Sequence, residues 1–208
     1  MIELLGDATG NCIRVAIALE EAGLPYRIRK IDLNKGEQRS REYLRLCPSG
    51  RVPTIIDDQG PRGERLVLTQ SNAILAYLGE KNGRLLPKDE YLRAKTLEWL
   101  LLFVTDVIAP SHQLFHLQRA LGPALSVDVT RELNRRSVSM YRHVDEELRR
   151  SPFIAGDSLS IADIAGYTIT AAIRDHLPWN SLTHVRTWFQ ALAQRAAFQR
   201  GAEVFSNP

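Results

Sequence analysis

The sequence predicts an α/β domain followed by an all-α helical bundle. Strand and helix patterns alternate through residues 1–81, and beyond residue 89 only helix patterns remain. Between them, residues 82–88 hold Gly and Pro around a short apolar pair, which is typical of a linker. We therefore expect an α/β domain at residues 1–81, a linker at residues 82–88 and a helical domain at residues 89–208.

The first four elements are predicted from the period of their apolar residues. Residues 2–5 form a short apolar strand, and residues 11–22 follow a helical period until Gly23 ends the helix. Residues 26–33 alternate apolar and mostly basic side chains, which is typical of a half-buried strand. Residues 38–46 then form a polar helix with one apolar side.

Three further elements complete the first domain. Residues 52–56 and 66–68 are apolar strands, and the turn-rich segment between them predicts a hairpin. Residues 71–81 form the last helix of the domain. The order β-α-β-α-β-β-α begins with a βαβ unit, whose two strands run parallel with a right-handed crossover.

Four amphipathic helices are predicted beyond the linker. They cover residues 91–116, 127–150, 161–174 and 184–195. The third begins with a capping box, because Ser160 is followed three residues later by Asp163, with Leu159 and Ile164 placed as a hydrophobic staple. A capping box stabilises the start of a helix.

Composition indicates a soluble, cytoplasmic protein. The net charge of +3 is small, so it agrees with an anionic small ligand and gives no support to nucleic-acid binding. Two cysteines provide no disulfide framework and suit a reducing compartment. The first residues lack a basic segment and an apolar core, and no run has the length needed to cross a membrane.

Two histidines and three aromatic residues are candidates for a second-substrate pocket in the helical domain. His112 and His116 share a helix face, but the sequence offers no third zinc ligand, so we predict no metal site. We place them at the border of that pocket. Trp99, Phe103 and Phe115 are its aromatic candidates, although their helical spacing also fits a core.

Two residue pairs in the first domain predict a receptor for a small anionic peptide. If the Val52–Pro53 bond is cis, the main-chain amide and carbonyl of Val52 are free to pair with a ligand's own backbone. Ser71, as the N-cap of a helix, offers its hydroxyl and nearby amides to a carboxylate. Gln70 beside it is able to accept from an amino group.

A third feature is the loop between the first strand and the first helix. A thiolate at a helix N-terminus has a lowered pKa, and a hydroxyl or amide donor stabilises it further. Thr9 and Asn11 supply such donors. Cys12 falls about one turn into the helix, where we expect a buried thiol.

Taken together, these features resemble the cytosolic glutathione transferase family, in its bacterial nu-like or beta-like branch, over nearly the whole chain. The resemblance implies a thioredoxin-like first domain in which Val52 and a cis Pro53 pair with the cysteinyl backbone of glutathione. It also implies that Gln70 and Ser71 hold the γ-glutamyl end.

The same resemblance suggests the residues near the sulfur and the glycyl end. Thr9 and Asn11 match the Thr-x-Asn pair of the nu-like branch, whereas the beta branch has its Cys at the position of Asn11, one before Cys12. Thr9 is our first catalytic candidate and Asn11 the second, with a mixed disulfide at Cys12 left open. Gln38 and Arg51 are candidates for the glycyl carboxylate.

The expected activity is therefore activation of the thiol of glutathione, a co-substrate, with no metal. The acceptor is an electrophile, as in detoxification, or a disulfide, and Thr9-x-Asn11 in place of Tyr or Ser favours the disulfide. The resemblance implies a homodimer. The alternative is a non-catalytic module that binds a protein partner, as in stringent-starvation-type proteins; the retained Val52, Pro53, Gln70 and Ser71 favour the enzyme.

Overall fold

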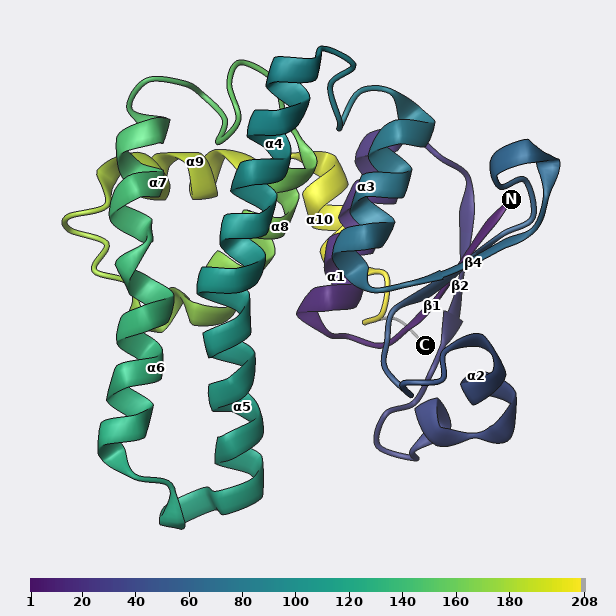
Figure 1. Cartoon of the computed structure of the whole chain (residues 1–208), viewed down its shortest axis with the longest axis horizontal. Coiled ribbons are helices and arrows are strands. Elements are labelled where there is room, and N and C mark those ends of the chain that lie inside the picture. The colour runs from purple at the N-terminus through teal and green to yellow at the C-terminus, as the bar shows by residue number, and fades with distance from the viewer. Residues whose placement is uncertain (207–208) are drawn as a thin grey trace. The chain divides into compact units, whose positions relative to one another are not determined.

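The computed structural model describes residues 1–206, which form two compact units. The first unit combines Met1–Leu86 with the chain from Ala193 onward, and the second is Pro87–Leu192. The first unit holds the sheet and its helices, and the second is helical (Figure 1). This is the predicted combination of a thioredoxin-like α/β domain and a helical domain.

The first unit is built on a four-stranded mixed sheet. Its strands are β1 (Ile2–Gly6), β2 (Tyr26–Lys30), β3 (Thr54–Asp57) and β4 (Leu66–Thr69). They lie in the order β2-β1-β3-β4, with β1 and β2 parallel and the other two pairs antiparallel. The predicted βαβ unit and β3–β4 hairpin are therefore both present.

The strand register brings three chain segments to one edge of the sheet. Thr54, at the start of β3, pairs with Leu5 near the end of β1 and with Thr69 at the end of β4. The segment after β1, the segment before β3 and the segment after β4 consequently begin at the same edge. These are the segments in which the sequence predicts ligand-binding residues.

Helices cover both faces of this sheet. On one face, α1 (Gly10–Ala22) packs against α3 (Ser71–Asn82), as Figure 1 shows. On the other, a 3-10 turn (Glu37–Arg39) leads into the short α2 (Arg41–Leu46), which packs on strand residues such as Leu5 and Ile56. We expected one helix over residues 38–46; instead Ser40 interrupts it and caps α2, its Oγ accepting from the Tyr43 amide at 3.2 Å.

The last helix, α10 (Ala196–Glu203), belongs to the first unit, whereas we expected residues 89–208 to form one domain. Its apolar face, which includes Phe198 and Gly201, is buried, and α10 packs against α1. At Gly201 the approach is so close that an added Cβ would lie 2.7 Å from the Ile17 amide nitrogen. Ion pairs from Arg195 to Glu21 and from Arg200 to Glu20 border this contact.

The second unit consists of helices, as predicted. They are α4 (Glu90–Leu102), a π-helical stretch (Phe103–Ile108), α5 (Ala109–Leu121), α6 (Val127–Ser139), α7 (Tyr141–Leu148), α8 (Ile161–Ile173) and α9 (Thr183–Ala193). The predicted helix over residues 127–150 is divided at Met140.

The predicted capping box at the start of α8 is confirmed. The Ser160 side chain and the Asp163 carboxylate exchange hydrogen bonds with each other's backbone. Asp163 also accepts from the Ile154 amide at 2.9 Å and from Trp188 Nε1 at 3.0 Å. Burial raises the pKa of Asp163, although hydrogen bonds from Ile154, Trp188 and Ser160 oppose the shift. Asp163 therefore ties three segments of this unit together.

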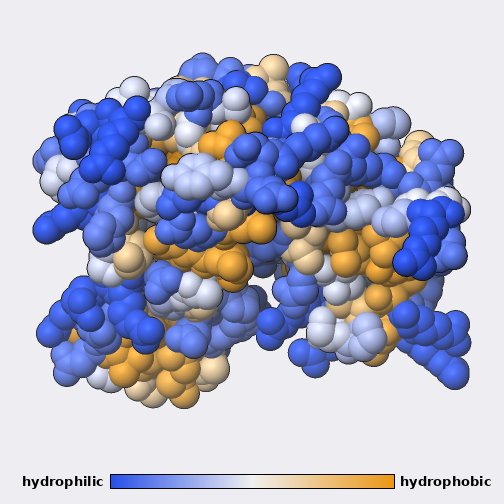
Figure 2. All heavy atoms as spheres, turned by 45° about the horizontal axis from the view of Figure 1, so that its top comes forward, coloured by the Kyte–Doolittle hydropathy of each residue, from blue (hydrophilic) through white to orange (hydrophobic). Residues whose placement is uncertain are grey.

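Part of the apolar surface lies on the second unit. Figure 2 shows hydrophobic residues at the lower left, where the α5–α6 hairpin ends, and Leu121 and Val127 are 47% and 73% exposed there. We expected no segment long and apolar enough to cross a membrane. The helical run Glu90–Ala124 meets that test by length and composition, which core helices of soluble proteins also do.

Candidate functional site

Four of the predicted ligand residues, Thr9, Asn11, Gln70 and Ser71, lie at the N-termini of α1 and α3. Asn11, in the first turn of α1, and Ser71, the first residue of α3, are 60 positions apart in the chain. Ser71 Oγ nevertheless lies 3.5 Å from Asn11 Oδ1. Side chains from the N-termini of α1 and α3 therefore meet, and the dipole and amides of a helix N-terminus favour an anion.

Thr9 is the N-cap of α1. Its Oγ1 accepts from the Cys12 amide at 3.3 Å, while its backbone has the extended conformation of a cap. A hydroxyl has one proton to donate and two lone pairs, so accepting from the Cys12 amide does not use the Thr9 proton, although the same hydroxyl also hydrogen-bonds with the Cys12 thiol. The side chain is half-buried, which suits a donor to a ligand sulfur.

Sequence reasoning missed Arg14. Its side chain is 2% exposed, and Nη1 donates to Ser71 Oγ at 3.0 Å and to Asn11 Oδ1 at 3.2 Å, with Asn72 Oδ1 at 3.4 Å. Burial lowers the pKa of Arg14 to about 10, which still leaves it charged at neutral pH. The available signal was an arginine standing as the sole charged residue in the stretch 10–19.

Ser71 does not cap α3 as we predicted. Gln70 occupies the N-cap position without a side-chain capping bond, and its φ of 69° is a conformation that residues other than Gly rarely adopt. Ser71 is the buried first residue of the helix, and its hydroxyl contacts Arg14 instead of the amides of its own helix. The Gln70 side chain remains exposed.

The segment before β3 presents main-chain groups. The Val52–Pro53 peptide bond is cis. Within residues 1–206, neither the amide nor the carbonyl of Val52 makes a hydrogen bond. The preceding carbonyl, of Arg51, accepts from Tyr43 Oη at 2.8 Å and from Cys47 Sγ at 3.2 Å, which anchors the segment to α2. The Arg51 side chain is exposed.

Gln38 lies next to this segment. A Cβ added at Gly50, which has a φ of 60°, would be 3.1 Å from the Gln38 carbonyl oxygen. The glycine therefore lets the 3-10 turn approach the residue that precedes Arg51. The side-chain oxygen of Gln38 is buried and has no hydrogen-bond partner among the residues that the structure describes.

Cys12 is buried, as predicted. It is fully inaccessible, and burial raises the pKa of its thiol to about 11, although a hydrogen bond with Thr9 opposes that shift. The thiol is therefore protonated at neutral pH and unsuited to nucleophilic attack. Both Cys12 and Cys47 are free thiols.

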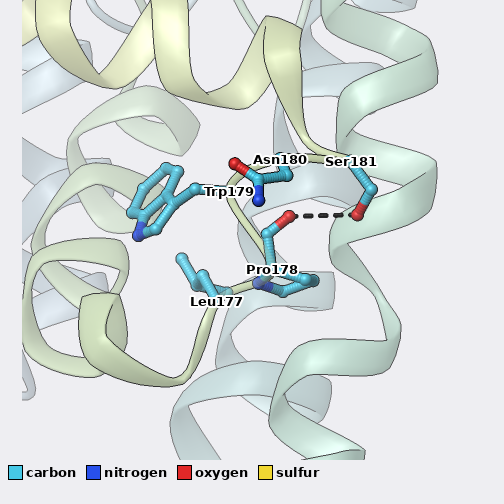
Figure 3. Close-up of a pocket in the computed structure, with 5 residues that line it drawn as sticks. All are labelled: Leu177, Pro178, Trp179, Asn180 and Ser181. Carbon is cyan, nitrogen blue, oxygen red and sulfur yellow. Dashed lines mark hydrogen bonds between the residues drawn. The ribbon is translucent and has the colours of Figure 1, made fainter.

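The second unit holds a shallow pocket lined by residues of the loop before α9. Figure 3 shows Leu177, Pro178, Trp179, Asn180 and Ser181 around it, with Ser181 Oγ donating to the Pro178 carbonyl at 3.0 Å. None of these side chains is titratable, and none was predicted as a site residue. The pocket offers apolar contact and few polar anchors.

The histidine pair and the aromatic candidates of the second unit do not converge on one site. His112 Nε2 and His116 Nε2 lie 2.9 Å apart, and the described residues contain no cluster of three or more metal-ligating side chains. Trp99 and Phe103 are buried in the core, whereas Phe115 is 51% exposed. The core placement explains the helical spacing of the first two.

Comparison with known proteins agrees with this geometry. Residues 10–81 match the model of the glutathione S-transferase N-terminal domain family. The chain is 34% identical to the disulfide-bond oxidoreductase YfcG of Escherichia coli, over 95% of this chain and 92% of that protein. It is also 27% identical to a glutathione S-transferase of Arabidopsis thaliana, over 94% of this chain and 93% of that protein.

Solved structures are similar over nearly the full length. A glutathione transferase from Burkholderia graminis, with two glutathione molecules bound per subunit, has a TM-score of 0.93 and 27% identity, covering 100% of this chain and 89% of that one. One from Pseudomonas putida, with one glutathione disulfide bound per subunit, has a TM-score of 0.89 and 28% identity, covering 97% and 90%.

Proposed function

Because this chain belongs to the glutathione transferase family, we propose that its first unit binds glutathione and activates the thiol of that tripeptide. The observation that carries the proposal is the 3.5 Å contact between Ser71 Oγ and Asn11 Oδ1. It joins the residue proposed for the carboxylate end of the ligand to a residue proposed for its sulfur. A single small ligand is thus able to touch both.

The γ-glutamyl end binds at the start of α3 in this proposal. Ser71 offers its hydroxyl, the N-cap residue Gln70 makes no side-chain capping bond within residues 1–206, and the helix dipole favours the α-carboxylate there. Gln70 receives the α-amino group through its exposed carboxamide. Its unusual φ of 69° supports this role, since strained residues cluster at ligand-binding positions.

The rest of the tripeptide follows the segment before β3. The cysteinyl residue pairs with the main-chain amide and carbonyl of Val52, in the manner of an added strand, beside the buried Pro53. The glycyl carboxylate reaches Arg51 and Gln38 in this proposal, which is supported by the close approach of Gly50, the neighbour of Arg51, to the Gln38 carbonyl oxygen. Arginine suits a carboxylate partner because its guanidinium donates in a planar fork.

The thiol is activated at the N-terminus of α1. Thr9 donates its remaining hydroxyl proton to the sulfur, and Asn11 supplies an amide donor. A hydrogen bond to a charged group contributes about 1.5–3 kcal/mol, which corresponds to roughly one to two pKa units of the thiol. Cys12 is buried and protonated, so the nucleophile is the ligand's own sulfur.

We favour disulfide reduction over conjugation. The glutathione thiolate attacks one sulfur of the substrate disulfide, forming a mixed disulfide and releasing a substrate thiolate that takes up a proton. A second glutathione thiolate attacks the mixed disulfide, yielding glutathione disulfide and the second reduced thiol. Thr9 and Asn11 in the positions proposed here, and a relative named as a disulfide-bond oxidoreductase, support this choice.

Side-by-side turnover of a model disulfide and a model aryl halide, with glutathione, tests the reaction class. We expect faster turnover of the disulfide, and faster turnover of the halide would favour conjugation. The non-catalytic alternative predicts no turnover of either, no retention on immobilised glutathione and no gain in thermal stability with excess glutathione.

We also propose a homodimer in a reducing compartment such as the cytoplasm. Helix α4 leaves Tyr91, Leu92 and Leu101 exposed at 71%, 42% and 57%, which supports a covered face. The two free thiols support the compartment. Sedimentation at micromolar concentration distinguishes a dimer from a monomer.

A further inference from the structure

We propose that Arg14 is a positioning residue that fixes the hydrogen-bond directions of Asn11 and Ser71, so that both present donors to glutathione. The inference rests on the function proposed above and extends it to a residue that has no place in the ligand contacts so far. Its basis is a buried guanidinium that contacts one side chain at each end of the site.

Arginine has five N–H donors and no acceptor, so any polar atom it contacts must accept. Nη1 lies 3.0 Å from Ser71 Oγ and 3.2 Å from Asn11 Oδ1. Because Arg14 is 2% exposed, water does not compete effectively for these contacts.

At Asn11, the contact selects one of two amide orientations. The carbonyl oxygen accepts from Arg14, so the amide nitrogen, with its two protons, lies on the opposite side of the carboxamide. A thiolate accepts hydrogen bonds and repels carbonyl oxygens. Without Arg14, the carboxamide is free to turn over and present its oxygen to the sulfur.

At Ser71, the contact selects the role of the hydroxyl. One lone pair of Oγ accepts from Arg14, so the single hydroxyl proton is left to donate. In the structure the acceptor in reach is Asn11 Oδ1 at 3.5 Å, a long contact. A ligand carboxylate is a stronger acceptor and would take that proton, with the positive charge of Arg14 one hydroxyl away.

In this proposal Arg14 affects both the carboxylate end of the ligand, through Ser71, and its sulfur, through Asn11. The test therefore measures one property of each end. A residue that acts on one end alone changes either the affinity for glutathione or the pKa of the bound thiol. Arg14→Gln, which removes the charge and offers an acceptor as well as donors, should change both. We expect the KM for glutathione to rise about tenfold and the bound thiol pKa to rise by about one unit.

The experiment compares Arg14→Gln and Arg14→Lys with wild type by steady-state kinetics and by ultraviolet titration of the bound thiolate. Arg14→Lys keeps the charge and an obligate donor, so both quantities should lie between those of wild type and Arg14→Gln. Arg200→Gln, which removes an exposed arginine from the same unit, is the matched control and should match wild type. Ser71→Ala should raise the KM with little effect on the thiol pKa.

Wild-type values for KM and thiol pKa in a folded Arg14→Gln would overturn the proposal. If Arg14→Gln does not fold, Arg14→Lys decides, since wild-type values of both quantities in that variant would show that neither end of the site needs the guanidinium. A change in KM without a change in thiol pKa also overturns the proposal, because Arg14 would then affect the carboxylate end of glutathione and not its sulfur. Failure of the wild type itself to bind glutathione would instead refute the proposed function.

Discussion

At the scale of single residues, the site depends on polar groups that are used twice. The Thr9 hydroxyl accepts from the amide of its own helix and keeps a proton for a ligand. The Ser71 hydroxyl accepts from Arg14 and donates its proton in a long contact of 3.5 Å to Asn11 Oδ1. The types and positions of these residues were predictable, because Thr and Ser precede helical patterns in the sequence. Their hydrogen-bond partners were not, because Arg14 and Ser71 are 57 positions apart.

Thr9→Ala should raise the pKa of the bound glutathione thiol by about one to two units, because a donor to the thiolate is lost. It should also cost about 1 kcal/mol of stability, since Thr9 caps α1. Thr9→Ser keeps the hydroxyl and should preserve both properties. The ultraviolet absorbance of the thiolate across pH measures the first, and an unchanged titration in Thr9→Ala removes Thr9 from its proposed role.

Cys12→Ala should leave glutathione-dependent activity within about twofold of wild type. The thiol is buried and its pKa is raised to about 11, so it takes no part as a thiolate near neutral pH. Stability should fall by about 1 kcal/mol, since a small buried side chain is shortened. Mass spectrometry after incubation with glutathione disulfide is the complementary check, and an adduct at Cys12 would contradict the assignment.

At the scale of elements, the sequence patterns predicted which segments form helices and strands more accurately than they predicted where those elements begin and end. The alternation around β2 was visible, yet the strand ends at Lys30 because Asp32 turns the chain, its Oδ1 accepting from the amides of Asn34 and Lys35 at 2.9 and 3.1 Å. The N-cap of α3 was misplaced by one residue. A positive φ at a glutamine has no signature in a single sequence.

One helix start in the second unit is capped from a different helix. Asp145 of α7 accepts at Oδ1 from the His184 and Val185 amides of α9, each at 2.9 Å, and at Oδ2 lies 3.0 Å from His184 Nδ1. Burial by itself would raise the pKa of Asp145, but these hydrogen bonds outweigh it and lower the pKa from its usual value of 3.8.

Asp145→Ala should therefore lose about 1–2 kcal/mol of stability at pH 7. A lowered pKa means that the unfolded chain binds more protons, so the contribution is present above about pH 4 and is lost as the pH falls further. Urea unfolding measures the difference in free energy of unfolding between wild type and Asp145→Ala, and this difference should become smaller below pH 4. Asp157→Ala, at an exposed position of the same unit, is the control; a difference that widens in acid would contradict the cap.

At the scale of the whole molecule, the division into an α/β part and a helical part was predictable, and the membership of the last helix was not. Period and composition label residues 196–203 as helical and amphipathic, which is compatible with either unit. Helix α10 joins the first unit because two contacts hold it there. Gly201 has no side chain, so the Ile17 backbone packs closely against it, and Arg200 forms an ion pair with Glu20, which is distant in the sequence. Such contacts are invisible in one chain without its coordinates.

Gly201→Ala should destabilise the protein by about 1–3 kcal/mol. The new methyl would lie 2.7 Å from the Ile17 amide nitrogen, closer than any ordinary contact, so α10 and α1 must separate slightly. Glu203→Ala, on the exposed side of the same helix, should be neutral. Thermal unfolding compares them, and equal melting temperatures would show that α10 does not pack on α1 in solution.

The enclosure of α1 by α10 also affects how the protein is made. A ribosome produces Met1–Leu86 first and the whole of Pro87–Leu192 next, and only then the segment that covers Ile17. Until that segment is made, the apolar surface of α1 around Ile17 is not covered by α10. The first unit therefore cannot complete its packing until the chain beyond Leu192 has been synthesised.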